Sequence, residues 1–463
     1  MLSWPKFCII FTGLVLLYFK VLIIIHNPLI IGDGHTRLDH ANSIIVSELN
    51  RAWLPFLQMH IWVFYKLGLP FWAFKLIPVF YFFIATVFLG LLVHRIINKD
   101  PQGLIFTIFS MVCFAFQPGV DFVSTSIYQE SIEMAFFYIL LYKGILDLKK
   151  SWFVFTITLL SLITRDTFFV YLLVLTILNY KKILADKQLF SVFMCCWAVP
   201  VVWYATDLIG TSIVLKHYPA LPWMLRNISD PSNAKLFNIN NLLASFQFNR
   251  IYFLIFTLIL GFFFIKRFGE DLKSKNSSHV DDHFKIFSLL SLGIVYFIYM
   301  YFDIWQATFA NPRIAMPLVP HLFIWMAIFF KETNQCPRLL KIILRICLVT
   351  ALLYMSYPGI FNLKTQYMDT AYVHDIGELR KQFFHKLRVC FITQNEWESQ
   401  KFFLGPALYM EREYIQPQEA HDFAKDNVVI APVDVQFKNN LFLRWKDIKV
   451  KDDFFTIYVR QGQ

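Results

Sequence analysis

The chain has 463 residues, of which 57% are hydrophobic and only 16% carry a charged side chain. Its mean hydropathy is +0.51. Because a soluble domain contains roughly 25% charged residues, this composition excludes a single soluble enzyme and indicates an integral membrane protein. The net charge of +11 does not indicate a nucleic-acid partner, because much of the basic charge lies in short loops between apolar segments.

Two further sequence features bound the interpretation. The seven cysteines are scattered, and no CxxC or His/Cys ligand spacing occurs, so we infer neither a disulfide framework nor a zinc site. The N-terminal apolar segment follows MLSWPK and has no small-x-small cleavage pattern. We therefore expect it to be retained as the first membrane span rather than removed as a signal peptide.

Hydropathy predicts an all-α polytopic membrane protein with about eleven transmembrane helices. They are expected at residues 7–26, 72–93, 103–117, 132–146, 152–163, 167–178, 189–206, 251–265, 286–302, 315–330 and 340–357. Lys and Arg cluster in the loops after the even-numbered spans, which predicts that these loops and the N-terminus are cytoplasmic. An alternative joins the fifth and sixth spans into one long buried helix with an internal ion pair.

The spans predict two domains. Residues 1–358 form a transmembrane domain with an outer loop at 27–71 that carries interfacial helices, and residues 359–463 form a small α+β soluble domain on the extracytoplasmic side. In this tail, strand-like segments at 389–393, 428–431 and 454–459 alternate with polar stretches, which is typical of a small α+β fold.

The outer loop at 27–71 concentrates ionisable residues in a chain that has few. Asp33 lies between two glycines, which let a ligand approach the backbone closely. Its carboxylate could act as a general base or hold a divalent cation; a helix N-cap is an equally good explanation. Arg37 is one helical turn away and could pair with Asp33 or with a phosphate. Asp39 and His60 are further candidates for substrate binding.

The outer loop before the fourth span contributes two acids. Glu130 lies at the edge of an apolar segment, where an ionisable group is costly and usually faces a cavity or a partner. The alternative is a first-turn carboxylate that complements the helix dipole. We favour a functional role for Glu130 and a structural role for Asp121.

Basic residues on the same face suggest binding of a phosphate. Arg165 and Asp166 divide the fifth and sixth spans, and the planar fork of an arginine suits lipid-linked phosphate oxygens. Arg313 is a second phosphate candidate, for which snorkelling to the interface is an equally good explanation. Lys216 belongs to a polar segment at 207–250 that we interpret as an interfacial lid over a site.

These motifs, in this order, resemble the GT-C superfamily of polytopic glycosyltransferases, which use polyprenyl- or dolichyl-phosphate sugars. The superfamily includes the protein O-mannosyltransferases and the bacterial enzyme that adds aminoarabinose to lipid A. The resemblance rests on Gly32-Asp33 with Arg37, Trp53-Leu54-Pro55, the stretch from Pro118 to Glu130, Leu162 to Asp166, and Asn311-Pro-Arg313 to Pro320. The first two are similar to a prokaryotic branch with a GD-x-x-x-R and W-L-P pattern. Many members have two adjacent acids in the first loop, whereas here Gly34 follows Asp33.

The resemblance implies an inverting transfer of one sugar from a polyprenyl-phosphate donor to a lipid, glycan or protein acceptor. Asp33 would act as the base and Glu130 would orient the acceptor or share that role, while Arg165 and Arg313 would bind the donor phosphate. A divalent cation (Mg or Mn) on Asp33 is an open option. The Phe-, Lys- and Ile-rich composition and the absence of a targeting signature favour a bacterial inner membrane over the endoplasmic reticulum. Two other functions are retained: a transporter or flippase of lipid-linked sugars, and a glycan ligase or polymerase.

Overall fold

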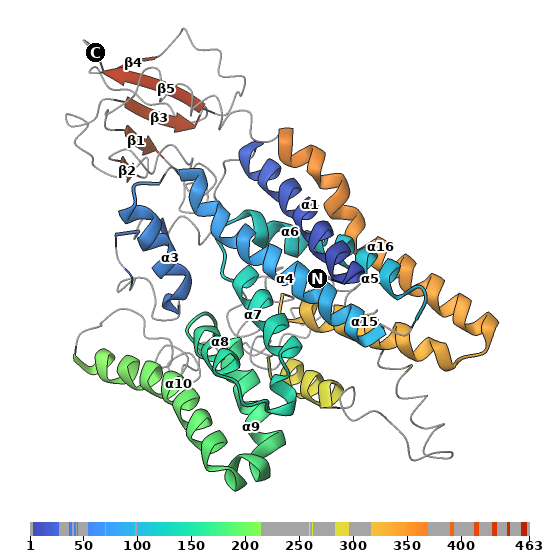
Figure 1. The fold of residues 1–463 in the computed structure, drawn as a ribbon. Coiled ribbons are helices and arrows are strands. Elements are labelled where there is room, and N and C mark those ends of the chain that lie inside the picture. The colour runs from blue at the N-terminus through green and yellow to red at the C-terminus, as the bar shows by residue number, and fades with distance from the viewer. Residues whose placement is uncertain are drawn as a thin grey trace, which may run out of the picture.

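The computed structural model of the chain is mostly helical (Figure 1). It describes residues 3–26, 37–38, 41–42, 44, 54–69, 71–97, 100–213, 259, 262, 283–295 and 316–368, together with five strands between residues 389 and 460. The α-helices of the longer described segments are α1 (Trp4–His26), α3 (Pro55–Lys66), α4 (Leu76–Ile97), α5 (Gly103–Ala115), α6 (Pro118–Thr125), α7 (Glu130–Tyr142), α8 (Trp152–Leu162), α9 (Thr167–Ala185), α10 (Lys187–Ile213), α15 (Leu318–Glu332) and α16 (Arg338–Met368). Short 3-10 turns are η1 (Phe71–Lys75), η2 (Ile145–Asp147) and η5 (Thr333–Gln335).

Within the described residues, four helices are long and apolar enough to cross a membrane. They cover Trp4–Ile25, Ala73–Ile97, Thr167–Ala185 and Arg338–Ser356, and the bent pair α5 and α6 can provide a fifth. The prediction of a helical protein with several membrane-crossing segments is thereby confirmed. The count of eleven spans stays a prediction, since the segments 251–265, 286–302 and 315–330 lie partly outside the described residues.

The expectation for residues 118–125 was wrong. Residues 118–125 were expected in a loop, but they form α6, because Pro118 occupies the first helical position and the Gln117 side chain accepts a hydrogen bond from the Val120 N–H at 2.6 Å. The axes of α5 and α6 meet at 63°. The expected domain boundary at residue 358 falls inside α16, which continues to Met368. The single long helix considered for the fifth and sixth spans is absent: α8 ends at Leu162 and α9 begins at Thr167.

The first helices pack closely around α4. Gly90 lies at this contact, where an added Cβ would come within 2.6 Å of the Met111 Sδ on α5 and 2.8 Å of the Ile9 Cγ2 on α1. Small residues allow membrane helices to approach in this way. Figure 1 shows α7 between this group and a second group formed by α8, α9 and α10. Helix α7 therefore connects the two parts of the helical region.

The C-terminal strands form one mixed sheet with the order β2-β1-β3-β5-β4. The strands are β1 (Val389–Ile392), β2 (Arg412–Ile415), β3 (Val428–Pro432), β4 (Phe442–Arg444) and β5 (Phe455–Arg460). β1 pairs in parallel with β2 and β3, and β5 pairs antiparallel with β3 and β4. β1, β3 and β5 lie where the sequence predicted strands. A separate α+β domain on the extracytoplasmic side stays a prediction.

Candidate active site

Two glutamates in the first turn of α7 define the centre of the site. Glu130 and Glu133 are one helical turn apart, so their carboxylates share one face of the helix. Glu130 has no exposed surface, and the positive end of the α7 dipole favours negative charge at this position. Desolvating two carboxylates is costly unless a cation lies beside them, and that cation is provided by Arg165.

Arg165 bridges the two carboxylates. Its Nη1 lies 2.5 Å from Glu130 Oε1, and its Nε lies 3.2 Å from Glu133 Oε2. The Thr167 hydroxyl donates a hydrogen bond to Glu133 Oε1 at 2.5 Å. The arginine is only 6% exposed. The side chains of Glu130, Glu133, Arg165 and Thr167 therefore form one buried polar cluster, which we call the acidic–arginine cluster.

The break between α8 and α9 positions this arginine. The Ser161 carbonyl accepts hydrogen bonds from the Thr164 and Arg165 N–H groups, which tightens the end of α8. The Thr164 hydroxyl donates to the Leu160 carbonyl at 2.7 Å, a local bond that competes with continuation of the helix. The Arg165 carbonyl then accepts from the Phe168 N–H in the first turn of α9. Arg165 thus projects from a fixed turn between two helices.

The outer loop reaches the same place through Arg37. This side chain is buried, and its Nη2 donates to the Gln129 Oε1 at 2.7 Å, directly before Glu130. The Gln58 amide donates to the Arg37 carbonyl at 3.0 Å, which connects Arg37 to α3. The Phe56 N–H in turn donates to the Ile163 carbonyl at the α8–α9 break. The outer loop, the start of α7 and the break therefore meet at the acidic–arginine cluster.

The other predicted site residues fall into two groups. Asp166 is exposed beside the cluster. His60 Nδ1 lies 2.8 Å from the Phe56 carbonyl oxygen within α3, and its Nε2 lies 3.1 Å from Tyr81 Oη, a contact that joins α3 to α4. Four predicted residues lie outside the described residues: Asp33, Asp39, Lys216 and Arg313.

A metal centre requires several ligands in one place. No group of three or more His, Cys, Asp and Glu side chains is brought together in the described part of the chain. The acidic–arginine cluster offers two carboxylates, and an arginine already neutralises part of their charge. The predicted cation on Asp33 concerns a residue outside this part and stays a prediction.

A second buried ion pair was not predicted. Lys20 on α1 pairs with Asp121 on α6, and both side chains are almost fully buried. The Lys20 ammonium also donates to the Ala115 carbonyl at 2.8 Å, at the end of α5. The pair ties the bent α5–α6 segment to the first span, and α6 leads directly to Glu130. The sequence signal for this pair was Lys20 itself, because an ionisable residue inside an apolar span usually pairs with another ionisable residue.

Comparison with known proteins supports the fold. No protein-family model matches the chain, and no curated protein matches it. Among solved structures, the chain is similar to the crystal structure of ArnT from Cupriavidus metallidurans bound to undecaprenyl phosphate, with a TM-score of 0.53, 10% sequence identity and coverage of 98% of each chain. ArnT is a lipid A aminoarabinose transferase of the GT-C superfamily. At this identity the likeness concerns the fold alone: this chain has an ArnT-like fold, as the resemblance in the sequence implied.

Proposed function

We propose that this chain is a membrane glycosyltransferase that moves one sugar from a polyprenyl-phosphate carrier to a lipid, glycan or protein acceptor at the extracytoplasmic membrane face. The observation that carries the proposal is the acidic–arginine cluster, which is buried at the start of α7 within an ArnT-like fold. The ArnT structure that supports this fold contains undecaprenyl phosphate, a carrier of the proposed class.

In the proposed reaction, an acceptor hydroxyl oxygen attacks the anomeric carbon of the donor sugar. A new carbon–oxygen bond forms while the bond from that carbon to the phosphate oxygen breaks, and the polyprenyl phosphate leaves with the electron pair. Asp33 takes the proton of the acceptor hydroxyl as the general base. Asp39, Asp166 and Lys216 would bind the substrates around this centre.

Arginine side chains stabilise the phosphate that is released. A guanidinium has five N–H donors, so Arg165 can contact two carboxylates and phosphate oxygens together. Glu130 and Glu133 would fix its orientation before the donor arrives, which is the preorganisation that electrostatic catalysis requires. Arg313 would provide a second contact to the phosphate. Glu130 would therefore act by holding Arg165 in place, in addition to the acceptor contact expected from the sequence.

A transporter of lipid-linked sugars is the second candidate. It is favoured by the Lys20–Asp121 pair, which is buried between helices, because paired charges inside a helical bundle can mark a substrate or ion pathway. A glycan ligase or polymerase would differ from the proposed enzyme by using a pyrophosphate-linked oligosaccharide as donor. The ligase or polymerase would make a different product, and the transporter would make none.

The test uses the full-length protein in proteoliposomes. The donors are undecaprenyl-phosphate-linked glucose, galactose, mannose and aminoarabinose, each radiolabelled in the sugar, and a bacterial envelope extract provides the acceptors. A transferase moves the label to an acceptor and releases undecaprenyl phosphate. A transporter leaves the label on the carrier and changes only the leaflet that holds it, an outcome that would replace the proposed function by the second candidate.

A matched pair of variants tests the assigned roles. Asp33→Asn and Glu130→Gln are expected to lower the transfer rate, whereas Asp186→Asn, which alters a surface carboxylate paired with Lys150, is expected to leave it unchanged. Full activity of Asp33→Asn in correctly inserted protein would exclude Asp33 as the base.

A further inference from the structure

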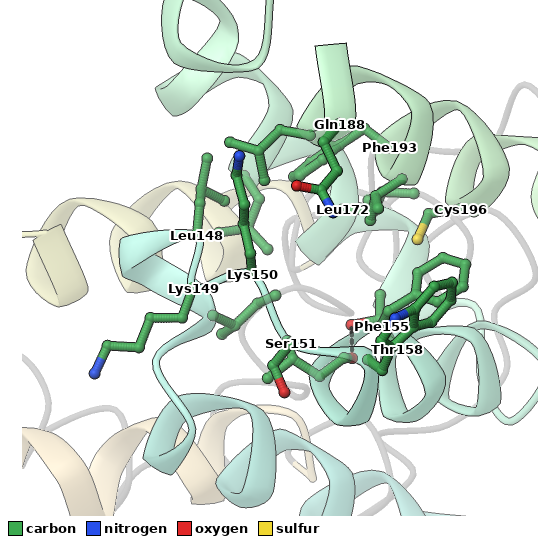
Figure 2. A pocket seen from close by; sticks show the side chains of 16 residues that line it. Leu148, Lys149, Lys150, Ser151, Phe155, Thr158, Leu172, Gln188, Phe193 and Cys196 are labelled. Atoms are coloured by element: carbon green, nitrogen blue, oxygen red, sulfur yellow. Dashed lines mark hydrogen bonds between the residues drawn. The ribbon is translucent and has the colours of Figure 1, made fainter. Parts of the chain in front are cut away.

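A cleft of about 150 Å³ lies between α8, α9 and α10, apart from the acidic–arginine cluster (Figure 2). Apolar side chains from all three helices line it: Val154, Leu172, Leu175, Leu189, Val192 and Phe193. Trp152, at the start of α8, also lines the cleft and is 81% exposed. An exposed tryptophan beside an apolar cleft is typical of the boundary between the lipid tails and the headgroups.

The mouth of the cleft is basic. Figure 2 shows Lys149 and Lys150 on the segment that leads into α8, with the side chain of Lys149 directed outward. The Lys150 ammonium lies 2.5 Å from Asp186 Oδ2, at the start of α10. Lys182 on α9 donates to the Asp147 carbonyl at 2.9 Å, which brings a third lysine to the same segment.

The backbone at the mouth is held in an unusual conformation. Leu148 has a φ of +53°, in the left-handed region that a branched side chain rarely adopts. Its side chain is buried and lines the cleft. This geometry directs Leu148 into the cleft while the next two residues, both lysines, stay exposed at its rim.

The mouth and the acidic–arginine cluster lie at opposite ends of the same helices. Helix α7 begins with Glu130 and ends at Tyr142, shortly before the mouth segment. Helix α8 begins at the mouth with Trp152 and ends at Leu162, shortly before Arg165. Thirteen helical residues span roughly 20 Å at 1.5 Å per residue. The cleft therefore opens toward the membrane face opposite to the proposed chemistry.

We propose that this cleft binds an anionic glycerophospholipid, with part of one acyl chain between α8, α9 and α10 and the phosphate at Lys149 and Lys150. The apolar walls match the chain, and the lysines match the charge of the headgroup. The lysine distribution of the sequence predicts that this face is cytoplasmic. Anionic phospholipids are abundant on that face, and the proposed reaction uses its lipid-linked donor on the opposite one. The lipid site does not depend on the proposed function.

Lipid retention measured by native mass spectrometry tests this inference on the full-length protein released from detergent. The probes are phosphatidylglycerol and phosphatidylcholine with identical acyl chains, added separately at the same concentrations. The wild type is expected to retain one phosphatidylglycerol in preference to phosphatidylcholine. Lys149→Gln and Lys150→Gln are each expected to weaken this binding roughly fivefold. Val192→Phe, which fills the cleft without changing its charge, is expected to abolish the preference.

Lys181→Gln is the matched control, because Lys181 is exposed on α9 and does not line the cleft. Three results would overturn the inference: equal retention of both lipids by the wild type, unchanged phosphatidylglycerol binding by the Lys149→Gln and Lys150→Gln variants, or an equal loss in Lys181→Gln. Displacement of bound phosphatidylglycerol by an equimolar amount of undecaprenyl phosphate would assign the cleft to the carrier lipid instead, and would also overturn it.

Discussion

Replacing Arg165 with methionine removes the cation from the acidic–arginine cluster and leaves Glu130 and Glu133 buried with their charges. Breaking a buried ion pair by deleting one partner costs about 3–5 kcal/mol. The Thr167 hydroxyl still donates to Glu133, so we expect a loss near the lower end of this range. That is a large fraction of the roughly 5–15 kcal/mol by which proteins are typically stable.

The assay is reversible unfolding of the purified protein in mixed micelles, followed by circular dichroism as the fraction of sodium dodecyl sulfate is raised. Arg165→Lys should lose less stability than Arg165→Met, because it keeps the charge but replaces the fork that contacts both glutamates with a single ammonium. Adding Glu130→Gln and Glu133→Gln to Arg165→Met should recover much of the loss, because a neutral buried cluster no longer contains unpaired charge.

The surface variant Asp186→Asn provides the control for this series and should unfold like the wild type. If Arg165→Met unfolds within about 1 kcal/mol of the wild type, then the three charged side chains do not form the buried network described here. The same conclusion would follow if the neutralising glutamine substitutions made Arg165→Met less stable instead of more stable.

Three further predictions concern the helical scaffold. Lys20→Met should destabilise the protein by about 3–5 kcal/mol, because it leaves Asp121 buried and charged, and Asp121→Asn in the same chain should restore part of the loss in the unfolding assay. Burial alone would raise the pKa of Asp100, but hydrogen bonds from Arg345, the Gln102 backbone and Asn334 outweigh it and hold the pKa below the ordinary value. The stability from this depressed pKa is present above the unfolded pKa of about 3.9 and lost as the pH falls through the folded pKa, so melting temperatures should fall there more steeply in the wild type than in Arg345→Gln; parallel curves would contradict this. Gly90→Leu should lower the melting temperature strongly, because the new side chain would overlap Met111 and Ile9, and an unchanged melting temperature would refute the close packing of α1, α4 and α5.

Local polar signals allowed parts of the site to be predicted from the sequence. The Thr164-Arg165-Asp166 triplet interrupts two apolar runs, and the structure places a helix break there. Glu130 was recognised because it lies at the edge of an apolar segment. Glu133 was missed, although its spacing of three residues from Glu130 places both side chains on one helix face and could have identified it.

Other features depend on contacts between distant segments. Lys20 and Asp121 are 101 positions apart, and nothing in either local sequence specifies the other as its partner. The link from Arg37 to Gln129 joins positions 92 apart, so the local sequence favoured the nearer Asp33 as its partner. The Pro-Gly-Val-Asp segment at 118–121 suggested a loop, because proline and glycine are also common in turns; the proline instead begins α6.

The rate of sugar–phosphate bond cleavage tests the central claim most directly. Purified wild-type protein, Asp33→Asn and Asp186→Asn are each incubated with an undecaprenyl-phosphate sugar that the wild type uses, together with its acceptor, and the released undecaprenyl phosphate is measured by mass spectrometry. Since a general base contributes roughly 10²–10⁴-fold to a rate, we predict cleavage by the wild type and by Asp186→Asn, and at least about a hundredfold slower cleavage by Asp33→Asn. Intact donor after incubation of the correctly inserted wild type with every donor and acceptor tested would contradict the claim that this chain is a glycosyltransferase.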